Sequence, residues 1–192
     1  PDDNAFFMTW EQNARLFAYS MADGPLPEHF EPHEAPVKNL LNGAGGNPCA
    51  RFTEDPSVRR GSIKDYPYVV TTYSVVEHWQ SGTQTRNIPW LNELIPSNFI
   101  ELSEELAKEK GIRPGDKVRV WNNRGSVVVD AMITIRMKPM MIDGKLTHVV
   151  GMPHHFSWAT KLATGDNVND LTPNVGDPNS YIPEYKAFLV NL

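Results

Sequence analysis

Small hydroxyl and amide side chains are concentrated in a polar segment from Gln80 to Thr85, three residues after an apolar, β-branched run from Tyr68 to Val76. The composition of that run predicts a buried strand. A strand that ends in a loop of Ser, Gly and Thr suits a phosphate group, because small side chains let backbone N–H groups approach an anion. The segment therefore predicts a phosphate-binding loop, with an ordinary polar turn as the alternative. It contains neither a Walker loop nor a dinucleotide GxGxxG sequence.

Glu77, His78 and Trp79 lie between the predicted strand and this loop. They offer a carboxylate acceptor, a ring donor and a stacking face. A carboxylate is a suitable partner for the ring N–H and amino group of guanine, although Glu77 could instead cap a backbone amide. His78 could contact a ligand or be an interior histidine with satisfied hydrogen bonds.

Further candidates lie in the second half of the chain. Adjacent strand residues point to opposite faces, so His154 and His155 do not readily chelate one metal ion, and one of them is expected to contact a ligand. Lys186 is a compact positive charge that suits a diphosphate, with an ordinary solvated lysine as the alternative. Cys49 is the only cysteine, which excludes an internal disulfide and an all-cysteine metal site. No residue is assigned as a metal ligand.

The 192-residue chain has the composition of a folded globular protein, with 40% hydrophobic and 21% charged residues. Its formal net charge of -5 argues against a general nucleic-acid binder, which needs a basic surface. No apolar run approaches the roughly 20 residues of a membrane span, so no membrane insertion by this chain is expected. The 16 prolines and 13 glycines indicate a loop-rich, β-rich chain rather than a helical bundle.

Two regions of the chain differ in pattern. Residues 1–65 are interrupted by prolines and lack a core-forming pattern, which predicts an extended arm that packs on the barrel or on a partner. His29 and His33 in this arm are expected at the surface. Residues 66–192 predict one small β-barrel domain with short helices.

The expected elements of the second region have local start and stop signals. Ser103 is a good N-cap for a short helix over Glu104–Lys110, and Gly111 suits its C-terminal end. Asn122–Gly125 predicts a hairpin turn, with Arg124 at its tip or facing a partner subunit. The expected strands cover residues 68–76, 98–102, 117–121, 126–135, 147–152 and 187–192.

Several segments, in the same order, resemble one known family. They are TTYSVVEHW at residues 71–79, GIRPGDKVRVWNNRGSVVVDA at 111–131 and LTPNVGDPNSYIPEYKAFLV at 171–190, with MADGPLPEHFEPHEAP at 21–36 before them. The chain resembles the C-terminal molybdopterin-dinucleotide-binding domain of molybdenum- or tungsten-dependent formate dehydrogenase large subunits. It is most similar to the respiratory, often exported type.

The resemblance implies a double-psi β-barrel, preceded by the extended arm, that caps the bis form of molybdopterin guanine dinucleotide. It implies an oxidoreductase that oxidises formate to carbon dioxide, with the metal ligand and the iron–sulfur cluster cysteines in upstream domains. This chain would then contain no catalytic residue and be inactive alone. The implied partners are those upstream domains and an iron–sulfur electron-transfer subunit. The implied location is the periplasm, or otherwise the cytoplasm.

The resemblance also assigns cofactor contacts. Relatives carry Gly and Arg where this chain has Thr72 and Tyr73, and His where it has Gln80, so the loop amides remain but a guanidinium is missing. The implied cofactor-binding residues are Thr71, Thr72, Tyr73, Glu77, His78, Trp79, Gln80, Ser81, Gly82, Thr83, His154, His155, Asn167, Asn169, Tyr185 and Lys186.

Two alternatives remain open at this point. The chain could be the end domain of another molybdopterin oxidoreductase, such as a nitrate or dimethylsulfoxide reductase. It could also be a cofactor-free double-psi barrel that serves as an adaptor for other proteins. A cofactor domain should bring the Gln80–Thr85 loop and Lys186 onto one face, whereas an adaptor has no reason to do so.

Overall fold

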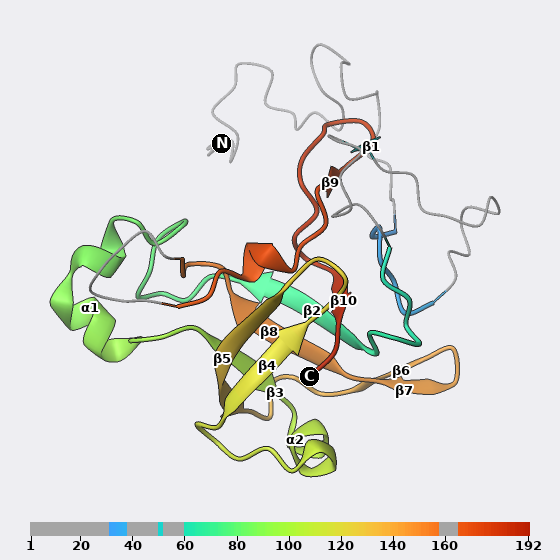
Figure 1. Cartoon of the computed structure of the whole chain (residues 1–192), viewed down its shortest axis with the longest axis horizontal. Coiled ribbons are helices and arrows are strands. Elements are labelled where there is room, and N and C mark those ends of the chain that lie inside the picture. Colours follow the sequence, from blue (N-terminus) through green and yellow to red (C-terminus); the bar gives the residue numbers. More distant parts are fainter. Residues whose placement is uncertain (1–30, 38–49, 52–59, 158–164) are drawn as a thin grey trace, which may run out of the picture.

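The computed structural model describes residues 31–37, 50–51, 60–157 and 165–192. Its centre is a curled 6-stranded sheet (Figure 1). In sheet order the strands are β10 (Phe188–Val190), β2 (Tyr68–Tyr73), β8 (Val149–Pro153), β3 (Phe99–Leu102), β5 (Ser126–Ile133) and β4 (Lys117–Trp121). Two small antiparallel pairs lie outside it: the hairpin of β6 (Met140–Ile142) and β7 (Lys145–Thr147), and β1 (Ala50–Arg51) with the distant β9 (Val175–Gly176).

The two edges of the sheet meet, which closes it into a barrel. Trp121 at the end of β4 and Asn191 just after β10 exchange backbone hydrogen bonds of 3.0 and 2.8 Å. Strands β2 and β8 pair in parallel, as do β3 and β5. This confirms the predicted fold class, mainly β with short helices and a double-psi β-barrel. The barrel interior is filled by fully buried apolar side chains, among them Val70, Ile100, Leu102, Leu106, Val120, Val150 and Phe188.

Local sequence signals account for several elements. The Ser103 hydroxyl accepts a hydrogen bond from the Leu106 amide at 3.1 Å and caps α2 (Glu104–Lys110). Gly111 ends this helix with a φ of 68°, a conformation that glycine adopts without a Cβ clash. In β4 alternate residues are buried, as the alternation of polar and apolar residues in its sequence predicts, and the burial of β5 alternates as well. The longest described helix, α2, has 7 residues, so none in the described ranges could cross a bilayer.

Other boundaries differ from the expectation. The first strand ends at Tyr73 rather than Val76, because the chain turns at the barrel rim instead of continuing the ladder. The hairpin strand β5 ends at Ile133 rather than Ile135. Thr147 belongs to β7 and not to the following strand. A short helix, α1 (Pro89–Leu94), was not expected; proline at its first position is compatible with a helix start.

Most of the predicted arm, including Cys49 and His29, lies outside the described residues. The part at residues 31–37 packs on the barrel domain, and His33, expected at the surface, is buried with 2% exposure. The expectation failed because a proline-rich pattern does not show which side chains another segment will cover. The boundary between arm and barrel near residue 65 stays a prediction.

Glu34 and Arg124 join this arm segment to the barrel through a buried ion pair. The two guanidinium nitrogens of Arg124 lie 2.5 and 2.9 Å from the Glu34 carboxylate oxygens. Backbone amides of Gly61 and Leu189 donate to the same carboxylate at 2.6 and 2.7 Å. Arg124 is thus at the hairpin tip, as predicted, but faces the arm of its own chain.

The pKa of Glu34 reflects these contacts. Burial acts to raise it, but the hydrogen bonds and charge of Arg124, with the two amides, outweigh burial and leave the pKa below the usual range. A carboxyl with a lowered pKa stabilises the fold above its unfolded-state pKa. That contribution is lost as the pH falls through the folded-state value.

We predict that Glu34→Gln lowers the free energy of unfolding of this chain by about 3–5 kcal/mol, because it leaves Arg124 buried without a counter-charge. Lys117→Met is the control, since Lys117 pairs with Asp130 at 2.6 Å but is 65% exposed. Lys117→Met should lower the free energy of unfolding by less than about 1 kcal/mol. Urea unfolding measures both values. Equal losses in the two variants would contradict this role for the Glu34–Arg124 pair.

Candidate functional site: a groove at one end of the barrel

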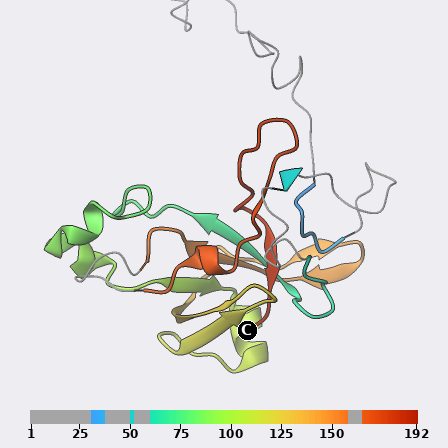
Figure 2. The same ribbon diagram turned by 45° about the horizontal axis from the view of Figure 1, so that its top comes forward.

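Strand pairing brings three distant segments to one end of the barrel. The parallel register pairs Thr72 of β2 with Met152 of β8, so both strands end at the same rim. The antiparallel register pairs Phe188 of β10 with Val70, so the residues just before β10 pass beside the end of β2. Figure 2 shows the closing segment, in red, projecting from the barrel before it returns as β10.

Thr72 holds the closing segment against this rim. Its hydroxyl donates to the carbonyl of Tyr185 at 2.8 Å, and its own carbonyl accepts from the Lys186 ammonium at 2.7 Å. A groove of about 290 Å³ opens beside these contacts. Its lining residues are Thr72, Gln80, Ser81, His154, Asn169, Tyr185 and Lys186. All of them are among the residues proposed from the sequence, and Ser81 and Lys186 face one groove.

The loop after β2 folds tightly over the end of β8. Gln80 and Gly82 have φ values of 54° and 75°. The Gly82 amide donates to Trp79 and its carbonyl accepts from the Arg86 amide, both at 2.8 Å. A Cβ at position 82 would lie less than 3.0 Å from the carbonyl oxygen of His155. Only glycine therefore fits where this loop crosses the end of β8.

The two adjacent histidines have different surroundings, although both lie beyond the end of β8 and their ring centroids are only 4.4 Å apart. His154 lines the groove. His155 is fully buried and points under the loop. Its Nε2 lies 2.9 Å from the Val75 amide and its Nδ1 lies 2.5 Å from the Gln80 carbonyl.

The groove has a positive electrostatic character. Among the described residues that line it, Lys186 carries the single formal charge and none is acidic. Burial lowers the pKa of His154, and the charge of Lys186 lowers it further. Both effects disfavour a second cation and leave a neutral ring beside an ammonium. Such a surface favours an anionic ligand.

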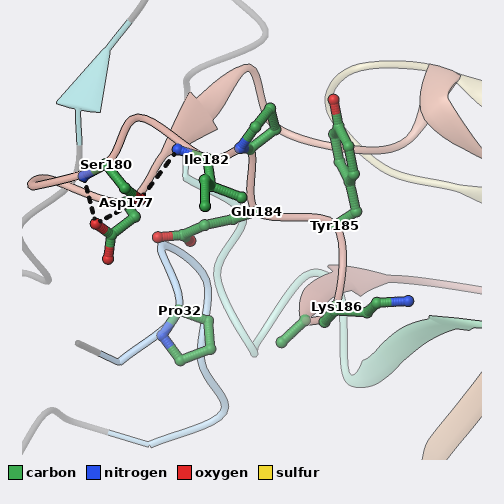
Figure 3. A pocket seen from close by; sticks show the side chains of 9 residues that line it. Pro32, Asp177, Ser180, Ile182, Glu184, Tyr185 and Lys186 are labelled. Atoms are coloured by element: carbon green, nitrogen blue, oxygen red, sulfur yellow. Dashed lines mark hydrogen bonds between the residues drawn. The ribbon is translucent and has the colours of Figure 1, made fainter. Parts of the chain in front are cut away.

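A second cavity, of about 380 Å³, adjoins the groove through Tyr185 and Lys186 (Figure 3). Two carboxyl side chains, Asp177 and Glu184, line this cavity and give it an acidic character. Burial raises the pKa of Glu184, and the nearby charge of Asp177 raises it further. Glu184 also accepts a 2.8 Å hydrogen bond from the backbone of His33. Figure 3 shows the Lys186 side chain pointing away from both carboxylates. The larger cavity is therefore less suited to an anion than the smaller one.

Several proposed residues lie outside the groove. Tyr73 faces away from Thr72, and burial, with the charge of Glu101, raises the pKa of its hydroxyl. His78 is buried, with its ring edge-on to Phe156 at 5.5 Å, which fits the interior alternative. The groove lining also excludes Thr71 in β2, half-buried Glu77, exposed Trp79 and Thr83, and Gly82.

Asn167 acts indirectly. Its side-chain oxygen accepts a 3.0 Å hydrogen bond from the Asn169 amide and caps the short 3-10 helix η3 (Val168–Asp170). Asn167 therefore helps to place Asn169, which does line the groove.

Arg86 is a structural residue that the sequence patterns did not single out. It lies in the 3-10 helix η2 (Thr85–Asn87) and is fully buried. Its guanidinium donates to the carbonyl and the hydroxyl of Ser157, both at 2.9 Å. Its carbonyl accepts from Asn92 of α1 at 2.6 Å. An arginine inside a polar loop gives no local signal that it will be buried.

The family model for the molydopterin dinucleotide binding domain matches residues 68–189, from the start of β2 into β10. The chain belongs to this family. It is 47% identical over 191 residues to the formate dehydrogenase subunit alpha of Megalodesulfovibrio gigas, covering 98% of this chain and 19% of that protein. It is 42% identical to the nitrate-inducible formate dehydrogenase major subunit of Escherichia coli over 190 residues, 97% of this chain and 18% of that subunit.

The chain thus spans about a fifth of the length of these relatives. Among solved structures, acetylene hydratase from Pelobacter acetylenicus superposes with a TM-score of 0.55 at 14% identity. The match covers 94% of this chain and 23% of that chain. At this identity it supports the fold alone.

We predict that Gly82→Ala destabilises the chain more than Gly144→Ala. Both glycines have positive φ, 75° and 72°, but a Cβ at position 144 would meet nothing within 4 Å. The control, Gly144→Ala, should lower the free energy of unfolding only by the cost of a left-handed backbone conformation at alanine, about 1–2 kcal/mol. Gly82→Ala adds a clash with the His155 carbonyl, which should cost about 1–3 kcal/mol more. Urea unfolding compares them, and equal costs would show that the loop does not pack on His155 as described.

Proposed function

We propose that this chain is the cofactor-binding end domain of the large subunit of a molybdenum or tungsten formate dehydrogenase. In this proposal the groove receives the diphosphate and pterin of a molybdopterin guanine dinucleotide. The observation that carries it is a single ammonium, anchored on Thr72, facing the Gln80–Ser81 turn across a groove with no acidic residue among its described lining. The family of the chain agrees with this ligand class.

The donors present fit the proposed cofactor. A lysine ammonium has three N–H donors, and the bond to Thr72 uses one of them. Lys186 and the Ser81 hydroxyl would then hold phosphate oxygens. The polar side chains of Asn169 and Tyr185, with the neutral ring of His154, suit the hydrogen-bonding edge of a pterin. Glu77, kept outside this groove, stays a candidate partner for guanine.

The role of the domain is to bind and orient. The metal bound by the pterin supplies the redox chemistry, and the groove side chains fix where the cofactor lies. Oxidation of formate to carbon dioxide, with the metal ligand and an iron–sulfur cluster, belongs in this proposal to upstream domains of the same subunit. An iron–sulfur subunit would accept the electrons. We propose a periplasmic location from the resemblance to the exported type, and we expect these 192 residues alone to be inactive.

The alternatives receive less support. The relatives named above are formate dehydrogenase subunits, and they match almost the whole chain at 42–47% identity. This favours a formate dehydrogenase over a nitrate or dimethylsulfoxide reductase. A cofactor-free adaptor gives no reason for Lys186 and Ser81 to face one groove. The chain therefore fits a cofactor domain better than an adaptor.

We predict that Lys186→Gln, introduced into the intact subunit, lowers cofactor retention about tenfold or more, because it removes a charge-assisted contact to phosphate. Lys145→Gln on the exposed β6–β7 hairpin is the control for losing one positive charge. The pterin content of the purified subunit after extensive dilution measures retention. Formate oxidation per bound cofactor should change much less than the pterin content.

Two results would count against the proposal. If both variants kept wild-type pterin content, Lys186 would not hold the cofactor. If the wild-type subunit contained pterin but oxidised a different substrate and not formate, the class of enzyme would be wrong while the binding groove stood.

A further inference from the structure

One imidazole joins the two ends of the loop that forms a wall of the groove. The Nε2 atom of His155 contacts the Val75 amide at 2.9 Å, and its Nδ1 atom contacts the Gln80 carbonyl at 2.5 Å. The ring is fully buried, and its backbone carbonyl lies against Gly82 of the same loop. His155 therefore does not line the groove but supports the loop from beneath.

These two contacts determine the protonation state of the ring. A backbone N–H can only donate, so Nε2 must accept and carries no proton. A carbonyl can only accept, so Nδ1 must carry the proton and donate. Both bonds exist together only in the neutral ring with its hydrogen on Nδ1. A doubly protonated ring would direct an N–H against the N–H of Val75.

We propose that His155 is a positioning residue that holds the loop from Val75 to Gln80 in the conformation that presents Gln80 and Ser81 to the cofactor. This inference rests on the proposed function of the groove. The loop needs such a stabilising contact because Gln80 has a φ of 54°, a backbone conformation that is unfavourable for a non-glycine residue. Without the Gln80 carbonyl bond, the turn loses the contact that opposes this strain.

The surroundings keep the ring neutral. Burial lowers the pKa of His155, the hydrogen bond to Gln80 acts to raise it, and the charges of His154, His78 and Arg86 lower it further. The ring centroids of His154 and His78 are 4.4 and 6.0 Å away. A histidine with a lowered pKa stabilises the folded state above its unfolded-state pKa, and this contribution is lost as the pH falls through the folded-state value. The hold of His155 on the loop is therefore expected to weaken as the pH falls.

The test uses the intact subunit and three variants. His155→Phe keeps an aromatic ring but removes both bonds. His155→Gln keeps an amide oxygen near the position of Nε2 that can accept from Val75, and has no titrating ring. His148→Phe is the matched control, because His148 is also buried, with 9% exposure. It lies between β7 and β8, with its ring against Tyr68 at the end of β2 opposite to the loop. The readouts are pterin content and hydrogen-exchange protection of segment 74–82, both measured between pH 7.5 and about pH 5.

At neutral pH we expect His155→Phe to lose pterin about tenfold faster than the wild type and to lose protection in segment 74–82. His155→Gln should recover part of both, and its protection factors should vary less with pH than those of the wild type. His148→Phe should match the wild type in this segment. Wild-type protection and pterin retention in both His155 variants would overturn the inference.

The two readouts separate this inference from the proposed function. If the wild-type subunit held no pterin, the proposed function would fail, and protection of segment 74–82 alone would decide whether His155 locks the loop. If pterin bound normally in His155→Phe while Lys186→Gln lost it, the groove assignment would stand and the positioning role of His155 would be wrong.

Discussion

The parallel pairing of β2 with β8 is the constraint on which the candidate site depends. These strands are about 80 residues apart in the sequence, yet their register ends them at one rim, where Thr72 and His154 lie close together. The antiparallel pairing of β10 with β2 adds the closing segment, and Thr72 secures it through two hydrogen bonds. Three segments that are far apart in the sequence thus share one groove. The closed sheet supplies the rigidity that a loop site needs.

Two neighbouring cavities differ in the charge of the side chains that line them. Lys186 stands at their boundary and directs its ammonium to the smaller groove. The larger cavity is lined by Asp177 and Glu184, and the Glu184 carboxylate accepts a hydrogen bond from the backbone amide of His33 in the arm. The same closing segment therefore contacts the arm on one side and, in our proposal, binds an anion on the other. The buried Glu34–Arg124 pair reinforces the first of these roles.

Features set by neighbouring residues could be predicted from the sequence. The cap at Ser103, the end of α2 at Gly111 and the alternation in β4 all depend on contacts within a few residues. The groove residues were recognisable through family resemblance together with the Ser-Gly-Thr loop. The pairing of Glu34 with Arg124, 90 residues apart, and the burial of His33 depend on tertiary contacts that leave no local pattern. Tyr73, by contrast, was grouped with Thr72 through the family resemblance, although strand alternation alone indicates that adjacent residues face opposite ways.

The central claim is that the groove beside Thr72 is where the diphosphate of the cofactor lies. A cryo-EM or crystal structure of the intact, cofactor-loaded subunit tests it most directly, through the distance from Lys186 Nζ to the nearest phosphate oxygen. Our account predicts a distance of about 2.7–3.2 Å, with the Gln80–Ser81 turn on the same phosphate. A diphosphate bound elsewhere, with Lys186 still contacting only Thr72, would contradict it.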